Sequence, residues 1–347
     1  MRSAPASAWR TVIWCTLALV NTSAGSQAQA PPPKPAPDAV ARAEQVLSEA
    51  RTALGGDKLA AVRTVVASGR TRRVRGNNLV PIEFEIFIEL PDKYVRIDEF
   101  PAEDADPTTS GFNGDGLIQI PAPPAAPAQG RGVPPAVPPS TAAPAGPGRI
   151  PLGGRGPAPD PRRARVMALK QDYTRLALGL FAASTSVPLT FSYAAIAEAP
   201  QGRADVLDAK GEGNTALRLF VNTETRVPVM VTWTTPPTNV IVTVPGQPAP
   251  KTVAPGAVVV AGPPPPAAGA SKEDTERYAK DVMALRATAM ATPVEHRLYF
   301  ADYRDVDGVR FPFRLRRAIG PETTEETTFD RFRINTKIDP RKLEPVK

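Results

Sequence analysis

Cysteine, histidine and long apolar runs are scarce in this sequence. Of the 347 residues, one is cysteine (Cys15) and one is histidine (His296). Because Cys15 has no cysteine partner and lies inside the apolar stretch 11–20, we expect no disulfide, no thiolate catalysis and no cysteine-bound metal. A zinc site or a Ser-His-Asp triad would have to use His296, and no Gly-x-Ser-x-Gly elbow precedes a helix. The sequence therefore argues against a metal centre, a cofactor site and these two kinds of catalysis.

Aromatic residues are also few, at 6%, and charge of one sign is not concentrated anywhere. The formal net charge is +7, with basic residues scattered among acidic ones. A nucleic-acid-binding surface needs a concentrated basic stripe and suitably placed aromatic residues. We therefore expect no nucleic-acid partner.

The longest apolar run near the N-terminus is "TVIWCTLALV", residues 11–20, and it follows the basic residues Arg2 and Arg10. A run of about ten residues is too short to span a bilayer, which needs about 20. With the small residues of "SQAQA" after it, the pattern is typical of a cleaved signal peptide over residues 1–30. We expect export to the periplasm, with no transmembrane span left after cleavage.

Proline, in contrast, is abundant, with 42 residues. Fourteen of them fall in 121–161 and ten in 236–266. Segments this rich in proline, alanine and glycine cannot bury enough apolar surface to offset the entropy of ordering. We therefore predict a proline-rich linker at 31–37 and a single domain over 38–347, interrupted by proline-rich insertions at 121–161 and 236–270.

Three segments have helical periodicity. The first spans 38–54 and stops at Gly55-Gly56, and the second opens at Pro161 with apolar residues three and four positions apart. The third runs from Lys272 to about Met290, after Ser271 as its cap.

The clearest strand reads "IEFEIFIEL", residues 82–90, in which apolar residues alternate with glutamates. Strict alternation indicates a sheet with one buried and one solvated face. About ten such segments follow one another, most of them joined by short turns and without the alternating strand–helix order of a parallel sheet. The predicted class is therefore α+β with an antiparallel sheet.

One acidic stretch raises two possibilities. "FADYRDVDGVRFPFRLRR", residues 300–317, places Asp302, Asp305 and Asp307 beside Gly308. A calcium loop of the helix–loop–helix type would need a glutamate where Arg314 stands, whereas Asp-Gly between two alternating segments is typical of a hairpin turn. The turn is favoured.

The adjacent acids Asp98-Glu99 and Glu325-Glu326 lie on strands and point to opposite faces, so neither couple can act on one bond.

Several pieces of the chain recur in the same relative order in a known family. They are "PDKYVR", "GFNGDGLIQI", "ADVLD", "LFVNTETRVPVMV" and "DYRDVDGVRFPFRLRR". In these the chain resembles the LolA/LolB-like outer-membrane lipoprotein carriers, and most closely their uncharacterised exported bacterial relatives. The resemblance implies a strongly curved antiparallel sheet, an incomplete barrel, with helices over a concave apolar face that holds acyl chains. It implies no catalytic residue.

From the alternation and the resemblance together we expect one inward-facing apolar set to line a ligand pocket: Phe84, Ile86, Ile88, Val229, Val231, Trp233, Leu298, Phe300, Phe311, Phe313 and Leu315. The same residues could instead pack as a closed core, and the sequence leaves both possibilities open.

The first functional hypothesis is a non-enzymatic binding protein that shelters a lipid or lipoprotein acyl chain. The second is an envelope interaction or sensor module of the same fold that binds a protein partner. The third, an envelope hydrolase, has the least support, because no catalytic constellation is visible.

Overall fold

The structure, a computed structural model, describes residues 37–75, 78–101, 105–122, 160–199, 202–246, 250, 253–267 and 269–345. The predicted signal peptide, nearly all of the predicted linker and most of the insertion at 121–161 lie outside these residues and stay predictions.

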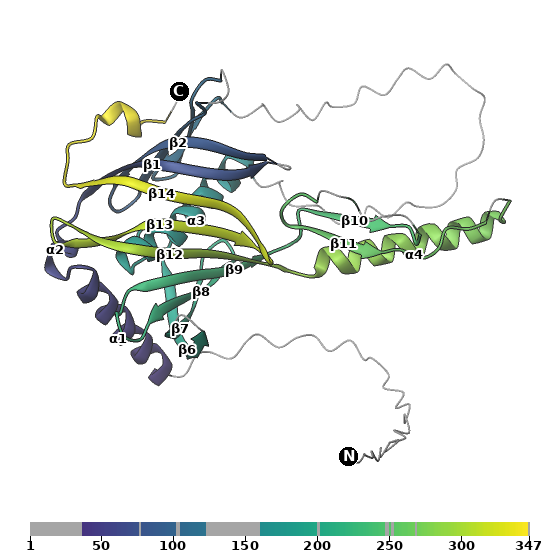
Figure 1. Ribbon diagram of the computed structural model, residues 1–347, viewed down its shortest axis with the longest axis horizontal. Coiled ribbons are helices and arrows are strands. Elements are labelled where there is room, and N and C mark those ends of the chain that lie inside the picture. Colours follow the sequence, from purple (N-terminus) through teal and green to yellow (C-terminus); the bar gives the residue numbers. More distant parts are fainter. Residues whose placement is uncertain are drawn as a thin grey trace, which may run out of the picture. The chain divides into compact units, whose positions relative to one another are not determined.

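A twelve-stranded sheet dominates the described part of the chain (Figure 1), in the order β5-β4-β3-β2-β1-β14-β13-β12-β9-β8-β7-β6. Its strands are β1 Thr64–Arg75, β2 Asn78–Glu89, β3 Lys93–Glu99, β4 Thr108–Asn113, β5 Gly116–Ile120, β6 Leu189–Ala199, β7 Gly202–Gly211, β8 Thr215–Asn222, β9 Pro228–Thr235, β12 Val294–Val306, β13 Val309–Ile319 and β14 Glu322–Ile334. All of its pairings are antiparallel, and β5 and β6 form its two open edges. The predicted α+β class with an antiparallel sheet that does not close into a barrel is confirmed.

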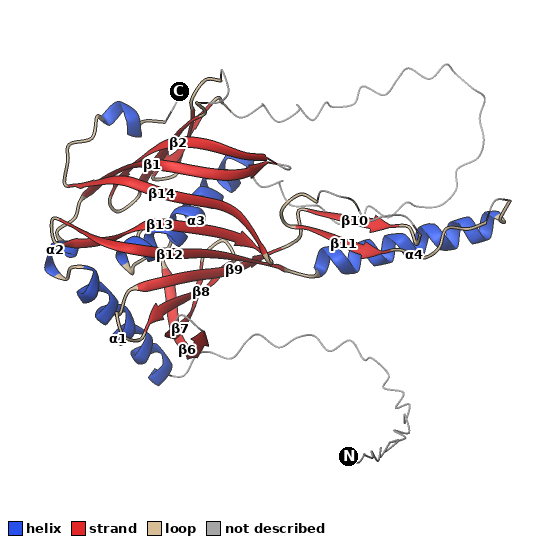
Figure 2. Cartoon of the chain, in the orientation of Figure 1, coloured by secondary structure: helices blue, strands red, loops and turns tan. Residues whose placement is uncertain are grey.

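The helices are α1 Pro37–Leu54, α2 Asp57–Ala60, α3 Pro161–Phe181 and α4 Lys272–Ala291, with a 3₁₀ turn, η1, at Pro340–Leu343. Figure 2 shows these helices in blue against the red strands. The three predicted helices are present within a residue or so of their expected ends, and Ser271 caps α4 as expected by accepting the N–H of Asp274 at 3.1 Å. One strand, β4, was not predicted, because its segment "TTSGFN" contains a single large apolar residue.

Helices α1 and α3 cover one face of the sheet, which we call the concave face. Their apolar residues pack with inward-facing side chains of the strands in one continuous core, in which Phe311 stacks on Phe332 at 4.8 Å between ring centroids. On β2 the expected alternation holds, with Ile82, Phe84, Ile86 and Ile88 all buried. Burial of such side chains contributes about 1.5–3 kcal/mol each relative to exposure.

The opposite face is not fully solvated, contrary to the expectation from alternation. There Val66, Phe87 and Val95 pack with Ile338 and Leu343 in a second, smaller apolar cluster. The last two residues belong to the segment after β14, which folds back over β2 and β3. The alternation of a strand shows only that its two faces differ, and it does not show which later segment covers the more polar one.

The described part of the insertion at 236–270 contains a separate two-stranded sheet, formed by β10 Asn239–Thr243 and β11 Ala257–Ala261. This pair is parallel, an exception to the predicted antiparallel pairing. Helix α4 has its main contacts with β10 and β11, so it does not share the covering role of α1 and α3.

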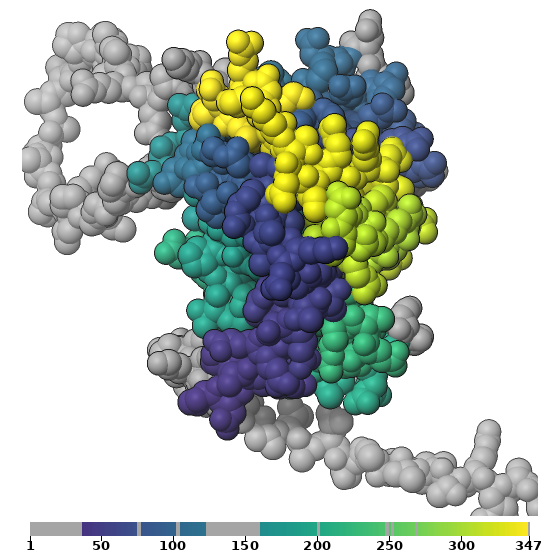
Figure 3. Space-filling view, turned by 90° about the vertical axis from the view of Figure 1, so that its left-hand side faces the viewer, coloured from purple at the N-terminus to yellow at the C-terminus, as the bar shows by residue number. Residues whose placement is uncertain are grey.

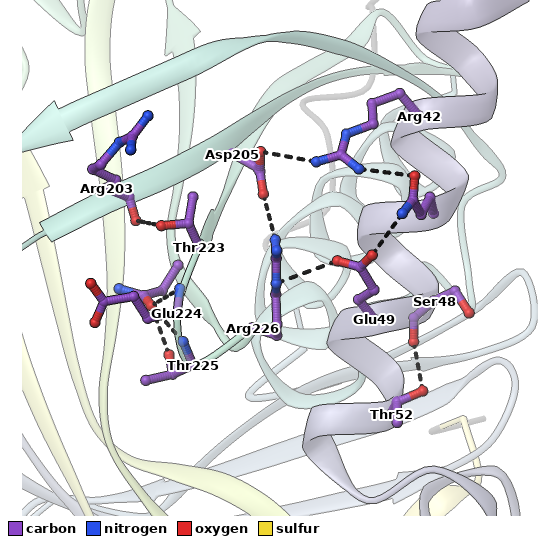
Figure 4. Close-up of polar contacts among 12 residues, drawn as sticks. Arg42, Ser48, Glu49, Thr52, Arg203, Asp205, Thr223, Glu224, Thr225 and Arg226 are labelled. Atoms are coloured by element: carbon purple, nitrogen blue, oxygen red, sulfur yellow. Dashed lines mark hydrogen bonds and ion pairs between the residues drawn. The ribbon is translucent and has the colours of Figure 1, made fainter.

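Helix α1 is joined to the sheet by buried charge as well as by apolar packing. The carboxylate of Asp205, on β7 and 2% exposed, lies 2.8 Å from Arg226 Nη1 and 3.8 Å from Arg42 Nη2. Arg226 Nε also lies 3.3 Å from the carboxylate of Glu49, so the turn after β8 and two sites on α1 meet at one point (Figure 4). Figure 3 shows α1, in purple, on the surface of the side that faces the viewer.

We expect Asp205→Asn to lower the free energy of unfolding by about 3 kcal/mol, because it leaves the half-buried Arg226 without its closest carboxylate. Denaturant unfolding of the full chain measures this. Asp208→Asn is the matched control on the same strand: its pair with Arg218 is 38% and 59% exposed and should contribute at most about 1 kcal/mol. Equal losses in the two variants would contradict the assigned role of Asp205.

Candidate functional site

Helix α3 lies against the concave face and is bound to both limbs of the open sheet. Its N-terminus is set by Asp160, whose carboxylate accepts the N–H of Arg162 at 2.9 Å, and by Pro161 in the first turn. Lys170 Nζ lies 2.7 Å from Asp115 in the β4–β5 turn, while Gln171 Nε2 donates to the carbonyl of Gly213 in the β7–β8 turn at 3.0 Å. One helix therefore connects strands that are far apart in the sheet order.

A cavity of about 350 Å³ lies between α3 and the sheet. This volume is within the range of about 300–1,000 Å³ that small-molecule sites occupy. Its walls are partly apolar and partly charged; the lining residues are Arg73, Ile86, Tyr94, Arg96, Asp98, Ser110, Leu169, Asp172, Leu176, Leu298, Leu315, Arg317, Glu325, Thr327 and Phe329.

The residues predicted to line a pocket fall into three groups. Ile86, Leu298 and Leu315 line the cavity. Seven others pack in the core of the concave face without lining it: Phe84, Ile88, Val231, Trp233, Phe300, Phe311 and Phe313. Val229 lies outside this core, beside an irregularity in the β8–β9 pairing. The concave face is thus packed at these seven residues and hollow beside Ile86, Leu298 and Leu315, and ligand binding there stays a prediction.

Sequence reasoning missed the charged groups of the cavity. Arg96 Nε donates to Asp98 at 2.6 Å on β3, and Arg73 Nε donates to Glu325 at 2.9 Å between β1 and β14. The strand register brings these charged residues together, because Glu325 on β14 is the cross-strand neighbour of both Arg73 on β1 and Arg317 on β13. A signal was present, since Arg317 continues the inward alternation of Phe313 and Leu315. Asp98 and Glu325 are distant in the sequence, so the pattern of adjacent acids does not show that both face the same cavity.

A further carboxylate, that of Asp172 on α3, is shared by two arginines. Arg175 Nη1 lies 2.7 Å from it, whereas Arg317 Nη1 lies 3.6 Å away. Both guanidinium groups also lie over the ring of Trp233, at 4.2 Å for Arg175 and 5.5 Å for Arg317. Such cation–π contacts hold arginine side chains in place at an apolar wall.

The pKa of Glu325 shows which charge state the site favours. Burial raises this pKa, but the positive charges of Arg73, Arg96 and Arg317 together outweigh burial, and the net result is a lowered pKa. Glu325 is therefore ionised at neutral pH. A carboxylate held in this state serves as an ion-pair partner and is poorly suited to donate a proton as a general acid.

His296 adjoins the charged end of the cavity. Its ring stacks on Trp233 with 5.1 Å between centroids, and its Nε2 lies 2.8 Å from Thr235 Oγ1. Burial lowers its pKa, and the charges of Arg317 and Arg175 lower it further. The imidazole is accordingly neutral at neutral pH.

The acidic stretch at 302–308 forms the end of β12 and the hairpin turn to β13, and the predicted turn is present. Asp307 and Gly308 have φ values of 55° and 86°, the left-handed conformation that a two-residue turn between twisted strands requires. Asp305 accepts the N–H of Gly308 at 3.0 Å, and Asp302 accepts Arg304 Nε at 3.1 Å. Within the described ranges, no three His, Cys, Asp or Glu side chains gather as metal ligands would.

No protein-family model and no curated protein matches the chain. Solved structures similar to it include a LolA superfamily protein from Nitrosomonas europaea (10% identity, TM-score 0.40), a DUF1329 family protein from Desulfovibrio piger (9%, 0.41) and a domain from Vibrio parahaemolyticus described as outer membrane lipoprotein-sorting (8%, 0.39). Each comparison covers 87% of this chain and 97% of the other. The first names the superfamily that the sequence resembles. Similarity this low carries no functional argument, so the function has to come from the site itself.

None of the described helices combines the length and the apolar composition needed to cross a bilayer.

We expect Glu325→Gln to lower the free energy of unfolding by about 3 kcal/mol at about pH 7, because it leaves Arg73 and Arg96 without this carboxylate charge. Since the folded-state pKa lies below the unfolded one, this contribution is complete above the unfolded pKa and is lost as the pH falls through the folded pKa. The difference between wild type and variant should therefore shrink below about pH 4. Urea unfolding across this pH range measures it, with the exposed neighbour Glu326→Gln as control. A pH-independent difference would refute the ion-pair assignment.

Because His296 is the only histidine, tag-free protein gives one imidazole signal in an NMR titration. We expect its midpoint below the ordinary value of 6.5. Arg317→Met should raise the midpoint by removing a neighbouring positive charge, whereas Asp172→Asn should lower it by removing a negative one. Shifts of the opposite sign would contradict the placement of these side chains.

Proposed function

We propose that the chain is an exported, non-enzymatic binding protein that shelters the acyl chain of a lipid or lipoprotein in the cavity beneath α3. The observation that carries this proposal is the cavity of about 350 Å³ between α3 and the concave face. Export is proposed from the signal-like pattern of residues 1–30.

The apolar part of the cavity wall suits a hydrocarbon chain. Ile86, Leu298 and Leu315 come from the sheet, and Leu169 and Leu176 come from α3 above it. Each methylene removed from water contributes about 0.8 kcal/mol, so about ten enclosed methylenes would contribute the roughly 8 kcal/mol that corresponds to micromolar affinity, before the entropic cost of association. The fixed position of α3, bound to both sheet limbs, keeps such a chain covered.

The direct test is to analyse what the protein carries. We expect mass spectrometry of organic extracts, from full-length protein purified out of the periplasm, to show a stoichiometric acyl-bearing molecule. A protein purified in the same way but unfolded before washing provides the background. Recovery of the same lipids from both preparations would reject specific binding.

We further expect Leu298→Trp to weaken binding of an uncharged probe, cis-parinaryl alcohol, by at least about tenfold, because the added ring displaces about two methylenes of the probe. Leu298 is buried on the sheet side of the cavity. Leu79→Trp, at a side chain 63% exposed, adds the same ring elsewhere and should leave the affinity unchanged. Fluorescence titration measures both.

If Leu298→Trp lowers the melting temperature, Leu176→Phe fills the cavity from the helix side and repeats the test. Unchanged affinity in both cavity variants would refute the site.

A second candidate is the interaction module, in which the same fold binds an envelope protein. It is favoured by exposed apolar side chains around the small sheet: Met283 is 71% exposed and Met290 43% exposed on α4, and Val259 on β11 is 40% exposed. Native mass spectrometry distinguishes the two candidates. A retained lipid supports the first, and a retained protein with no lipid supports the second.

A further inference from the structure

Three arginines and three carboxylates line the charged end of the cavity, and Arg175 beside it takes the closest contact of one of these carboxylates. Arg96 is matched with Asp98, and Arg73 is matched with Glu325, each through a hydrogen bond shorter than 3 Å. The third carboxylate, of Asp172, is hydrogen-bonded to Arg175 at 2.7 Å. Arg317 is the fourth cation and has only the longer approach of 3.6 Å to the same Asp172.

The donors of Arg317 are free to bind a ligand. A guanidinium group carries five N–H donors and no acceptor. Among the described residues, no hydrogen-bond partner accepts from this group, although Arg317 lines the cavity and its side chain is only 29% exposed. Nearby, Arg175 Nε is buried and also lacks an acceptor within the part of the chain that the structure describes. Donors left unmatched beside a cavity are the complement of an incoming oxyanion.

We propose that the charged end of this cavity binds a monoanionic headgroup, a carboxylate or a phosphodiester, with Arg317 as its main ligand. The proposal rests on the proposed function for the acyl chain and adds the chemical class of the lipid: an anionic amphiphile whose chain lies against Leu298 and Leu315 and whose headgroup lies at Arg317. Leu298 and Leu315 are direct neighbours of Arg317, the first by cross-strand pairing and the second two positions earlier on the same strand.

The surrounding charges favour one negative charge over two. Arg73, Arg96 and Arg317 line the cavity with three carboxylates, and Arg175, paired with Asp172 of the wall, adds a fourth positive charge beside it. A monoanion balances this set of charges, whereas a second negative charge would be close to Asp172 and Glu325. Unbalanced charge in a partly buried site is costly. A neutral headgroup would leave the guanidinium donors unmatched, and a cationic one would be repelled.

The first experiment compares cis-parinaric acid with cis-parinaryl alcohol, which differ only in the headgroup, by fluorescence titration of the full chain. We expect the acid to bind at least about tenfold more tightly. Arg317→Met should remove this preference, so that the acid loses affinity relative to the alcohol, and Arg317→Lys should restore part of it. Arg316→Met is the matched control, because Arg316 is exposed on the opposite face, over the ring of Tyr299.

The second experiment reads the same site through His296. A bound anion near Arg317 should raise the pKa of His296 towards its ordinary value, because it offsets the positive charge that lowers this pKa. NMR titration with the acid should show the rise, titration with the alcohol should not, and Arg317→Met should abolish it. Acetate alone tests whether a free carboxylate is sufficient.

The outcomes separate this proposal from the proposed function. Equal binding of acid and alcohol, insensitive to Arg317→Met, overturns the headgroup site and leaves the acyl-binding function standing. If neither amphiphile binds, the acyl-binding function fails. In that case the acetate titration decides whether an anion site remains. A rise in the pKa of His296 that Arg317→Met removes supports a site for a free anion. No rise in this pKa overturns the anion site. An acetate effect as strong as that of parinaric acid, at equal concentration, also assigns the site to free anions and overturns the lipid headgroup.

Discussion

The attachment of α3 to both limbs of the sheet is the interaction on which the rest of this structure depends. An open sheet of twelve strands exposes a long apolar face, and that face must be covered. The buried apolar residues of α3 hold the helix across it, and the ion pair of Lys170 with Asp115 and the hydrogen bond from Gln171 to Gly213 add a contact with each limb. Close packing requires a glycine in α3, because a methyl group on Gly179 would overlap the ring of Phe300. The position of α3 determines where the concave face is packed and where it is hollow.

The cavity forms where charged side chains replace aromatic ones along the same strands. On β13, Phe311 and Phe313 belong to the packed core, and Leu315 and Arg317 reach the cavity. Arginine and glutamate side chains that are matched with each other cannot fill space as stacked aromatic rings do, so a hollow remains between α3 and the sheet. Two of these ion pairs join different elements, Arg73 with Glu325 between β1 and β14 and Arg317 with Asp172 between β13 and α3. These two also favour the observed arrangement of the elements that they join.

The sequence predicted the elements more completely than their partners. Alternation along β2 and helical spacing along α3 follow from local chain geometry, and both can be read from single segments. The hairpin at Asp307-Gly308 was predictable for the same reason. The coverage of Phe87 by the segment near Leu343 and the meeting of Asp98 with Glu325 could not be predicted, because each joins segments that are distant in the chain.

The sequence by itself determined the α+β class, the antiparallel pairing of the large sheet and, apart from Val229, the apolar residues that face inward, because side chains alternate in direction along an uninterrupted strand. The tertiary structure decided which of those residues meet a cavity. Ile86, Leu298 and Leu315 do so, and chemically similar neighbours such as Ile88 and Val231 do not. The physical reason is that a cavity is a property of three-dimensional packing: it depends on where α3 crosses the sheet and on which arginines find carboxylates there.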